Sequence, residues 1–344
     1  RGRAHPQDAP RRRFGVTGAG AKSVTGAGAK SVTGAGASAV MREVAIVAPT
    51  ASGKSDVAMA VAQETGAHIV AVDAMQVYRG MDIGTAKPTT ADRALVPHHC
   101  IDLAEPSERF TVAEFQKHAA AARAEIAAAG KHALLVAGTG LYLTALIDDL
   151  SLPGEWPEVR NELQREPDTD ALFARLELLD PLAASRIERS NRRRIERALE
   201  VCIGSGRQFS SFGPGTSAYP TSNVQQIGIT WARATLSARV EARVHRMMSD
   251  GLLAEVEQLA ASTTLSREAR QALGYHELLA HLDGRLSLDE AVAQIVLHTR
   301  QFAVRQERWF RRDPRIEWVV VNDDPVAEVA PKVLAALRRS QDKI

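Results

Sequence analysis

The chain has 344 residues, 45% of them hydrophobic, which is enough to bury a large core in one large or two modest domains. Its 43 Lys and Arg residues nearly balance 41 Asp and Glu residues, so the net charge of +2 excludes a general attraction to nucleic acid and leaves only a local basic patch for that purpose. Two cysteines, no CxxC pair, no signal peptide and no apolar run of membrane-spanning length predict a reduced, cytoplasmic protein with no membrane association.

Residues 1–40 are rich in Arg, Gly and Ala and repeat with a period of eight, a composition that cannot form a core. We expect a disordered or spurious extension ahead of a true start at Met41. A basic tail that binds nucleic acid is the alternative. The fold is expected to begin at residue 41.

A phosphate-binding loop is predicted between an apolar strand at residues 44–47 and a helix at residues 56–65. In such a loop the backbone N–H groups surround a diphosphate at a helix N-terminus, Lys54 reaches the phosphates and the Ser55 hydroxyl can hold Mg²⁺. Ala48 stands where such loops begin with glycine, so a Cβ must be tolerated there. The predicted diphosphate-binding residues are Ala48, Pro49, Thr50, Ala51, Ser52, Gly53, Lys54 and Ser55.

Two further strands end in residues that can face this loop, because ligands of open parallel sheets bind at the carboxyl ends of the strands. The strand at residues 68–72 is followed by Asp73, either a Mg²⁺ ligand or general base or, equally, the cap of the next turn. Lys87 is a second candidate cation for phosphate, or else a surface lysine. The strand at residues 133–137 leads to Thr139 between two glycines, which can donate a hydrogen bond to phosphate or simply form a turn.

After residue 150 the composition shifts to charged helices, with arginines concentrated between residues 185 and 208. Arg193 and Arg197 lie four residues apart on one helical face, whereas Ile195 and Leu199 point elsewhere. This pattern favours contact with a phosphate backbone over a merely solvated face.

The rest of the chain returns to the sheet. A strand is predicted at residues 227–231, followed by helices at 236–249 and 252–261, a loop carrying Arg267 and Arg270, a long helix at 288–312, a strand at 316–321 and a final helix at 325–339. On the long helix, Arg305 lies on a face for anions and Gln306 on a packing face.

These elements predict an α/β fold, a P-loop NTPase-like parallel sheet flanked by helices with an inserted small all-helical domain. Residues 41–150 and 224–344 would form the P-loop-containing catalytic core, and residues 151–223 the inserted helical domain, whose arginine stripe favours phosphate contact.

With these residues in view, the chain resembles the tRNA dimethylallyltransferases over roughly residues 42–321. Five blocks occur in the family's order: residues 48–55, 73–87, 138–142, 193–201 and 300–312. The resemblance implies transfer of a dimethylallyl group from dimethylallyl diphosphate to N6 of adenosine 37 in tRNA, with release of pyrophosphate. By the same resemblance the enzyme is of the bacterial type and monomeric, and residues 151–223 are its tRNA-binding domain.

The resemblance also implies the roles of individual residues. Lys54, Ser55 and the loop amides would hold the diphosphate with Mg²⁺, Asp73 would accept the N6 proton, and Thr139 and Arg160 would stabilise the departing pyrophosphate. The implied tRNA-binding residues are Asp73, Ala74, Met75, Gln76, Arg193, Arg194, Arg197, Arg270 and Arg305.

Three positions depart from the family's pattern, namely Ala48, Ala137 and residues 187–191. They leave a catalytically impaired tRNA-binding paralogue as one alternative. A P-loop kinase would share the loop and Mg²⁺ but not the Arg-rich insertion, and an adenylate isopentenyltransferase acting on AMP would lack much of that insertion.

Overall fold

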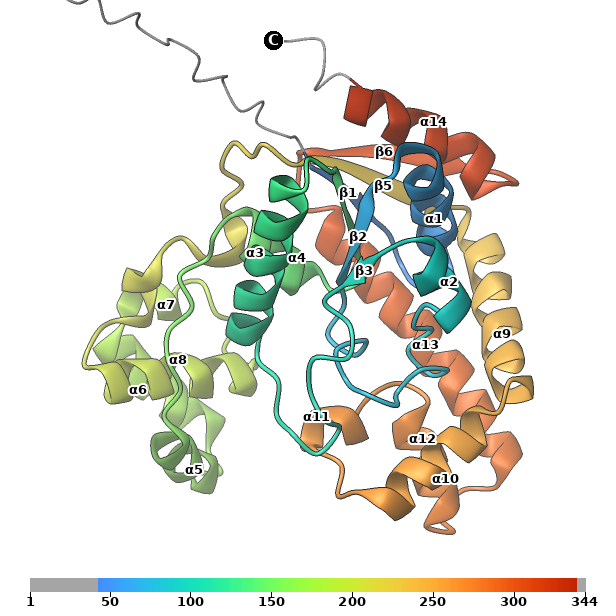
Figure 1. Ribbon diagram of the computed structural model, residues 1–344. Helices are drawn as coiled ribbons and strands as arrows, with labels where there is room; N and C mark the ends of the chain where they lie inside the picture. The colour runs from blue at the N-terminus through green and yellow to red at the C-terminus, as the bar shows by residue number, and fades with distance from the viewer. Residues whose placement is uncertain (1–42, 339–344) are drawn as a thin grey trace, which may run out of the picture. The chain divides into compact units, whose positions relative to one another are not determined.

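The computed structural model describes residues 43–338, in which six strands form one parallel sheet of order β3-β2-β4-β1-β5-β6 (Figure 1). The strands are β1 (Val44–Val47), β2 (His68–Val72), β3 (His98–His99), β4 (Ala133–Ala137), β5 (Gln225–Trp231) and β6 (Ile316–Val321). Every residue of β1 and β4 is buried, as a parallel sheet covered on both faces requires. The predicted α/β sheet is confirmed, whereas the prediction for residues 1–40 lies outside the described residues.

Helices cover both faces of the sheet. On one face α1 (Lys54–Thr65) and α14 (Pro325–Arg338) pack together and bury Val57 and Val333 against Ile46 of β1. The other face carries α3 (Val112–Ala128), α4 (Gly140–Ile147), α10 (Leu252–Ser262), α12 (Tyr275–Leu282) and α13 (Leu288–Phe310). Helix α9 (Arg233–Ser249) packs against α13. Within residues 43–338 no helix is long and apolar enough to cross a bilayer.

Two short helices occupy stretches where no helix was expected. Helix α2 (Thr90–Leu95) begins at a capping box made by Thr89 and Asp92. Helix α11 (Arg267–Arg270) falls in the predicted loop, and the Ser266 side chain accepts a hydrogen bond from the amide of Ala269 at its start. Both helices depend on side-chain caps, which stabilise a single helical turn that apolar periodicity cannot reveal.

The helices between α4 and β5 have a core of their own. They are α5 (Pro157–Arg165), α6 (Thr169–Leu179), α7 (Pro181–Ala184) and α8 (Arg192–Ser205), and they bury Leu163, Leu176, Ile195 and Leu199 in a separate apolar cluster (Figure 1). Two 3₁₀ turns, η1 (Phe209–Phe212) and η2 (Gly215–Ser217), lead back to the sheet. All described residues belong to one compact unit, so a division into core and inserted domain stays a prediction.

Candidate active site

One large pocket, about 1750 Å³ in volume, opens at the carboxyl ends of β1, β2 and β4. The segments 50–55, 73–76 and 138–140 line it, together with residues of α9 and α13. Parallel strands bring their carboxyl ends to one edge of a sheet, and this edge is where ligands of such sheets bind. The three strand ends that the sequence singled out therefore meet in one place.

The loop after β1 lines the pocket only from Thr50 onward, because Ala48 and Pro49 are buried. Ala48 does not carry a positive φ, so the glycine-like backbone angle that we expected to be at issue there is absent. The left-handed angles occur further along, with φ of 62° at Ala51 and 90° at Gly53. The strained non-glycine residue of this loop is Ala51.

The loop presents donors that nothing in the described part of the chain accepts. The N–H groups of Ser52 and Gly53 donate to no other group within residues 43–338. The Ser52 hydroxyl is buried and likewise has no partner there. Buried polar groups are almost always satisfied, and successive amides in such a turn form a concave site for an anion. The loop is therefore built to receive an anionic ligand.

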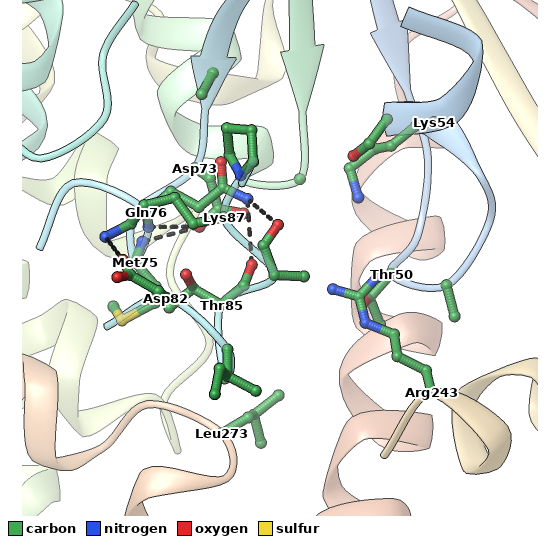
Figure 2. A pocket seen from close by; sticks show the side chains of 18 of the residues that line it. Thr50, Lys54, Asp73, Met75, Gln76, Asp82, Thr85, Lys87, Arg243 and Leu273 are labelled. Atoms are coloured by element: carbon green, nitrogen blue, oxygen red, sulfur yellow. Dashed lines mark hydrogen bonds and ion pairs between the residues drawn. The ribbon is translucent and has the colours of Figure 1, made fainter. Parts of the chain in front are cut away.

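Two cations flank the loop, Lys54 at the start of α1 and Arg243 on α9 (Figure 2). Within the described residues neither has a carboxylate at ion-pair distance. Burial, and next the nearby Arg243, lower the pKa of Lys54 from its ordinary value of 10.5 to about 8. Burial also lowers the pKa of Arg243. Two desolvated cations with no described carboxylate at ion-pair distance, and with Asp73 and Asp56 only nearby, make the site attractive to a diphosphate.

Asp73 lies on the opposite wall of the pocket in Figure 2. Its Oδ1 accepts hydrogen bonds from the amides of Met75 at 2.9 Å and Gln76 at 3.3 Å. Its Oδ2 has no donor among residues 43–338, and a Cβ added to Gly138 would lie only 2.8 Å from it. The glycine thus leaves the space beside a carboxylate oxygen that is free to accept a proton or to bind a metal.

Thr139 and Gln76 each keep one polar group for a ligand. The amide of Ala74 donates to Thr139 Oγ1 at 3.0 Å, so the hydroxyl hydrogen remains free to donate. The Gln76 Nε2 donates to the carbonyl oxygens of Thr85 and Ala86, both at 3.2 Å. The Gln76 Oε1 has no donor in the part of the chain that the structure describes and can accept one from a ligand.

Gln306 of α13 joins two of the ligand-facing segments, a role that the sequence did not reveal. Its Oε1 accepts from the amide of Thr50 at 2.9 Å, and its Nε2 donates to the carbonyl of Gly138 at 2.7 Å. The residue was expected only on a packing face. The only signal in the sequence was a polar side chain on a predicted packing face, where a buried amide would need hydrogen-bond partners.

Lys87 has neither of the two roles predicted for it, a cation for phosphate or a surface lysine. Its side chain is fully buried, and its ammonium donates to the Tyr78 carbonyl at 2.6 Å, to Asp82 at 2.6 Å and to Asp102 at 2.7 Å. Three partners use all three donors of a lysine. Lys87 is therefore a structural cation rather than a phosphate ligand or a surface lysine.

The structure does not bring Arg160 to the pocket. Its guanidinium pairs with the buried carboxylate of Glu200 at 2.8 Å and also approaches Glu155. Its predicted catalytic role stays a prediction that requires α5 to approach the pocket.

The arginines predicted to bind tRNA fall into three groups. Arg305 lines the pocket, while Arg193, Arg194 and Arg270 are exposed outside it. Arg197 is half-buried and donates to the carbonyl oxygens of residues 153 and 154, so its stripe with Arg193 is only partly free.

The oxygen atoms around the loop fit Mg²⁺ only when a diphosphate is also present. The described residues contain no group of three or more His, Cys, Asp or Glu that could hold a metal alone. They do offer the hydroxyls of Ser55 and Thr139 and the Oδ2 of Asp73 at the pocket. Mg²⁺ commonly takes one or two protein oxygens and completes its shell with substrate phosphates and water.

Comparison with known proteins gives a consistent result. The IPP transferase family matches residues 76–313, and the isopentenyl transferase family matches residues 41–96. A tRNA dimethylallyltransferase of Kineococcus radiotolerans is 47% identical over 86% of this chain and 96% of its own length. The corresponding values for that of Paenarthrobacter aurescens are 43%, 85% and 95%.

Solved structures agree with these relatives. The tRNA isopentenylpyrophosphate transferase of Bacillus halodurans aligns with a TM-score of 0.64 and 35% identity, covering 88% of this chain and 98% of that one. A eukaryotic dimethylallyltransferase acting on tRNA shares the fold, with a TM-score of 0.72 at 23% identity over 85% of this chain and 77% of that one.

Proposed function

This chain belongs to the tRNA dimethylallyltransferase family, and we propose that it moves the dimethylallyl group of dimethylallyl diphosphate to N6 of adenosine 37. It is an enzyme that prenylates tRNA. The donor, the acceptor atom and the residue roles are the proposal.

The observation that carries this proposal is the asymmetry of the pocket. One wall holds unpaired cations and free amides, at Lys54, Arg243 and the loop, and the other holds the free Oδ2 of Asp73. A diphosphate matches the first wall, and a proton-bearing nucleophile matches the second. The allylic carbon of the donor would lie between them.

The reaction then balances as follows. The N6 nitrogen forms a bond to C1 of the dimethylallyl group, the bond between C1 and the diphosphate oxygen breaks, and pyrophosphate leaves with the electron pair. The N6 proton passes to Oδ2 of Asp73, since the amine becomes acidic as it is alkylated. Lys54, Arg243, the loop amides and the Thr139 hydroxyl stabilise the charge that develops on pyrophosphate. Mg²⁺, held by Ser55, would neutralise further phosphate charge when bound.

The adenine is expected against Met75 and Gln76, because the free Oε1 of Gln76 can accept a hydrogen bond from a base edge. Taking an unpaired loop base out of its stack costs little. Exposed Arg193, Arg194 and Arg270 and the pocket residue Arg305 would contact the phosphate backbone.

The test combines purified protein, unmodified tRNA, Mg²⁺ and radiolabelled dimethylallyl diphosphate. We expect label on adenosine 37, with at least about 100-fold slower transfer in Asp73→Asn, because a lost general base typically costs that much. Thr139→Val should slow transfer less. Asp289→Asn, an exposed residue in the first turn of α13, is the matched control.

Further reaction mixtures separate the alternatives. Label on AMP but not on tRNA would indicate an adenylate isopentenyltransferase, and phosphate transfer from labelled ATP would indicate a kinase. Binding of tRNA with no transfer of label would indicate an impaired paralogue. A monomeric state and a cytoplasmic location stay predictions, of which sedimentation tests the first.

A further inference from the structure

Two residues from the second half of the chain donate hydrogen bonds to carbonyl oxygens of the phosphate loop. Arg239 of α9 donates from Nε to the carbonyl of Ala51 at 2.9 Å. Trp231, the last residue of β5, donates from Nε1 to the carbonyl of Ser52 at 3.0 Å. The two side chains also touch each other, with the Arg239 guanidinium 4.4 Å from the centre of the Trp231 ring.

These bonds fix the direction of two consecutive peptide groups. In a trans peptide the C=O and the following N–H point in opposite directions. Tying the carbonyls of Ala51 and Ser52 outward therefore turns the amides of Ser52 and Gly53 the other way, and these are the amides without an acceptor in residues 43–338.

The loop needs such support because its conformation is not the one its residues prefer. Ala51 holds a φ of 62°, a left-handed angle that costs a non-glycine residue about 1–2 kcal/mol. A loop without external bonds would relax toward right-handed angles and rotate these peptides. The Trp231 side chain is nearly fully buried, which keeps water from competing for the Ser52 carbonyl.

We propose that Trp231 and Arg239 are positioning residues that hold the phosphate loop in its anion-binding conformation through the Ser52 and Ala51 carbonyls, Trp231 from outside the pocket and Arg239 from its wall. This inference rests on the proposed function, since the anion is taken to be the donor's diphosphate. Strand β5 and helix α9 would then hold in place a site whose ligand-facing residues lie mostly in the first third of the chain.

The decisive variant is Trp231→Phe, which keeps an aromatic ring under Arg239 but removes the N–H. The substitution changes no charge, so any loss of anion affinity must act through the loop. We expect pyrophosphate, measured by calorimetry, to bind about five- to tenfold more weakly, the usual worth of one buried hydrogen bond. The donor KM should rise similarly, while the tRNA KM stays unchanged.

Arg239→Lys tests whether Arg239 acts through the fixed geometry of its guanidinium or only through its positive charge. It keeps a positive charge near the loop, yet a flexible ammonium replaces the fixed guanidinium that stacks on Trp231. We expect a loss of pyrophosphate affinity close to that of Trp231→Phe, and a double variant whose loss is smaller than the product of the two, because both act on one loop. Arg233→Ala, an exposed arginine at the start of the same helix, should bind pyrophosphate as the wild type does.

The outcomes are distinct. Wild-type protein that binds neither pyrophosphate nor the donor would contradict the proposed function itself. Wild-type binding with unchanged affinity in Trp231→Phe would overturn the positioning role alone. A fall in kcat and in the thermal midpoint with an unchanged donor KM would also overturn it, because that pattern indicates general destabilisation.

Discussion

The loops that follow β1 and β2 line the same pocket, but they differ in whether their lysine has partners within the protein. After β1, Lys54 has no carboxylate at ion-pair distance in residues 43–338, and the loop amides lack acceptors. After β2, Lys87 uses all three of its donors within the protein.

The same contrast holds for the acidic groups around the second loop. Glu255 of α10 accepts from the amides of Asp82, Ile83 and Gly84 at 2.7–3.2 Å and from the Tyr275 hydroxyl at 2.5 Å. The 82–87 part of the loop after β2 thus has its partners within the protein, while the loop after β1 depends on a ligand for its partners. The presence of a lysine near a phosphate site therefore says little until its partners are known.

The largest expected effect of breaking this contrast is on folding. Lys87→Met should lower the free energy of unfolding by about 3 kcal/mol, because it removes three hydrogen bonds of a buried ammonium at about 1 kcal/mol each, although Asp102 keeps its ion pair with Arg93. Urea unfolding gives this value, and pyrophosphate affinity of the folded variant should be little changed. A stable variant that has lost pyrophosphate binding would reverse the assignment of Lys87.

Lys54→Met should show the opposite pattern. Removing an unpaired cation leaves no orphaned carboxylate, so unfolding should be unaffected or slightly more difficult. Pyrophosphate affinity should fall about 30- to 100-fold, in line with the loss of a charge-assisted hydrogen bond of roughly 2–3 kcal/mol. Calorimetric titration at pH 7 measures the fall, and equal affinity in the two proteins would contradict the assigned contact.

The lowered pKa of Lys54 predicts a pH dependence of donor binding. The free protein holds Lys54 protonated below about pH 8, whereas the bound diphosphate favours the ammonium. Affinity for dimethylallyl diphosphate, measured with EDTA to exclude metal, should therefore fall about tenfold between pH 7 and 9. Lys54→Arg should flatten this dependence, and an equally steep fall in that variant would exclude Lys54 as its source.

The lowered pKa of Lys54 also makes the free energy of unfolding depend on pH, and this dependence runs in the opposite direction to that of donor affinity. Between about pH 8 and 10.5 the unfolded chain binds the Lys54 proton and the folded free protein does not. The contribution of Lys54 to the free energy of unfolding therefore rises with pH across this window, while donor affinity falls. Comparing wild-type and Lys54→Met unfolding at pH 7.5 and 9.5 isolates this contribution.

The smallest effect is expected from Glu255→Gln. The amide oxygen can still accept from the loop after β2, but the charge that strengthens those bonds is gone. A loss of about 1 kcal/mol should lower the thermal midpoint by about 2 °C in a chain of this size. Glu257→Gln, exposed on the same helix, is the matched control and should leave the midpoint unchanged.

Local patterns in the sequence were sufficient to predict the strands of the sheet and the chemistry that follows each of them. Largely apolar runs of four or five residues followed by small or polar residues identified β1, β2 and β4, with Lys54, Asp73 and Thr139 in the segments that follow them. These features are local, since strand periodicity and turn residues act over a few positions. Because parallel strands share one edge, the meeting of the three segments also followed from the pattern.

Which side chains are free for a ligand and which have partners within the protein depends on long-range packing. Gln306 lies 256 residues from Thr50, and Arg239 lies 188 residues from Ala51, so no local pattern indicates either hydrogen bond. The burial of Lys87, the unpaired state of Arg243 and the distance of Arg160 from the pocket depend likewise on what packs against each residue. The sequence shows which hydrogen-bond donors and acceptors the chain possesses. Whether each of them has a partner depends on groups that packing brings from distant segments.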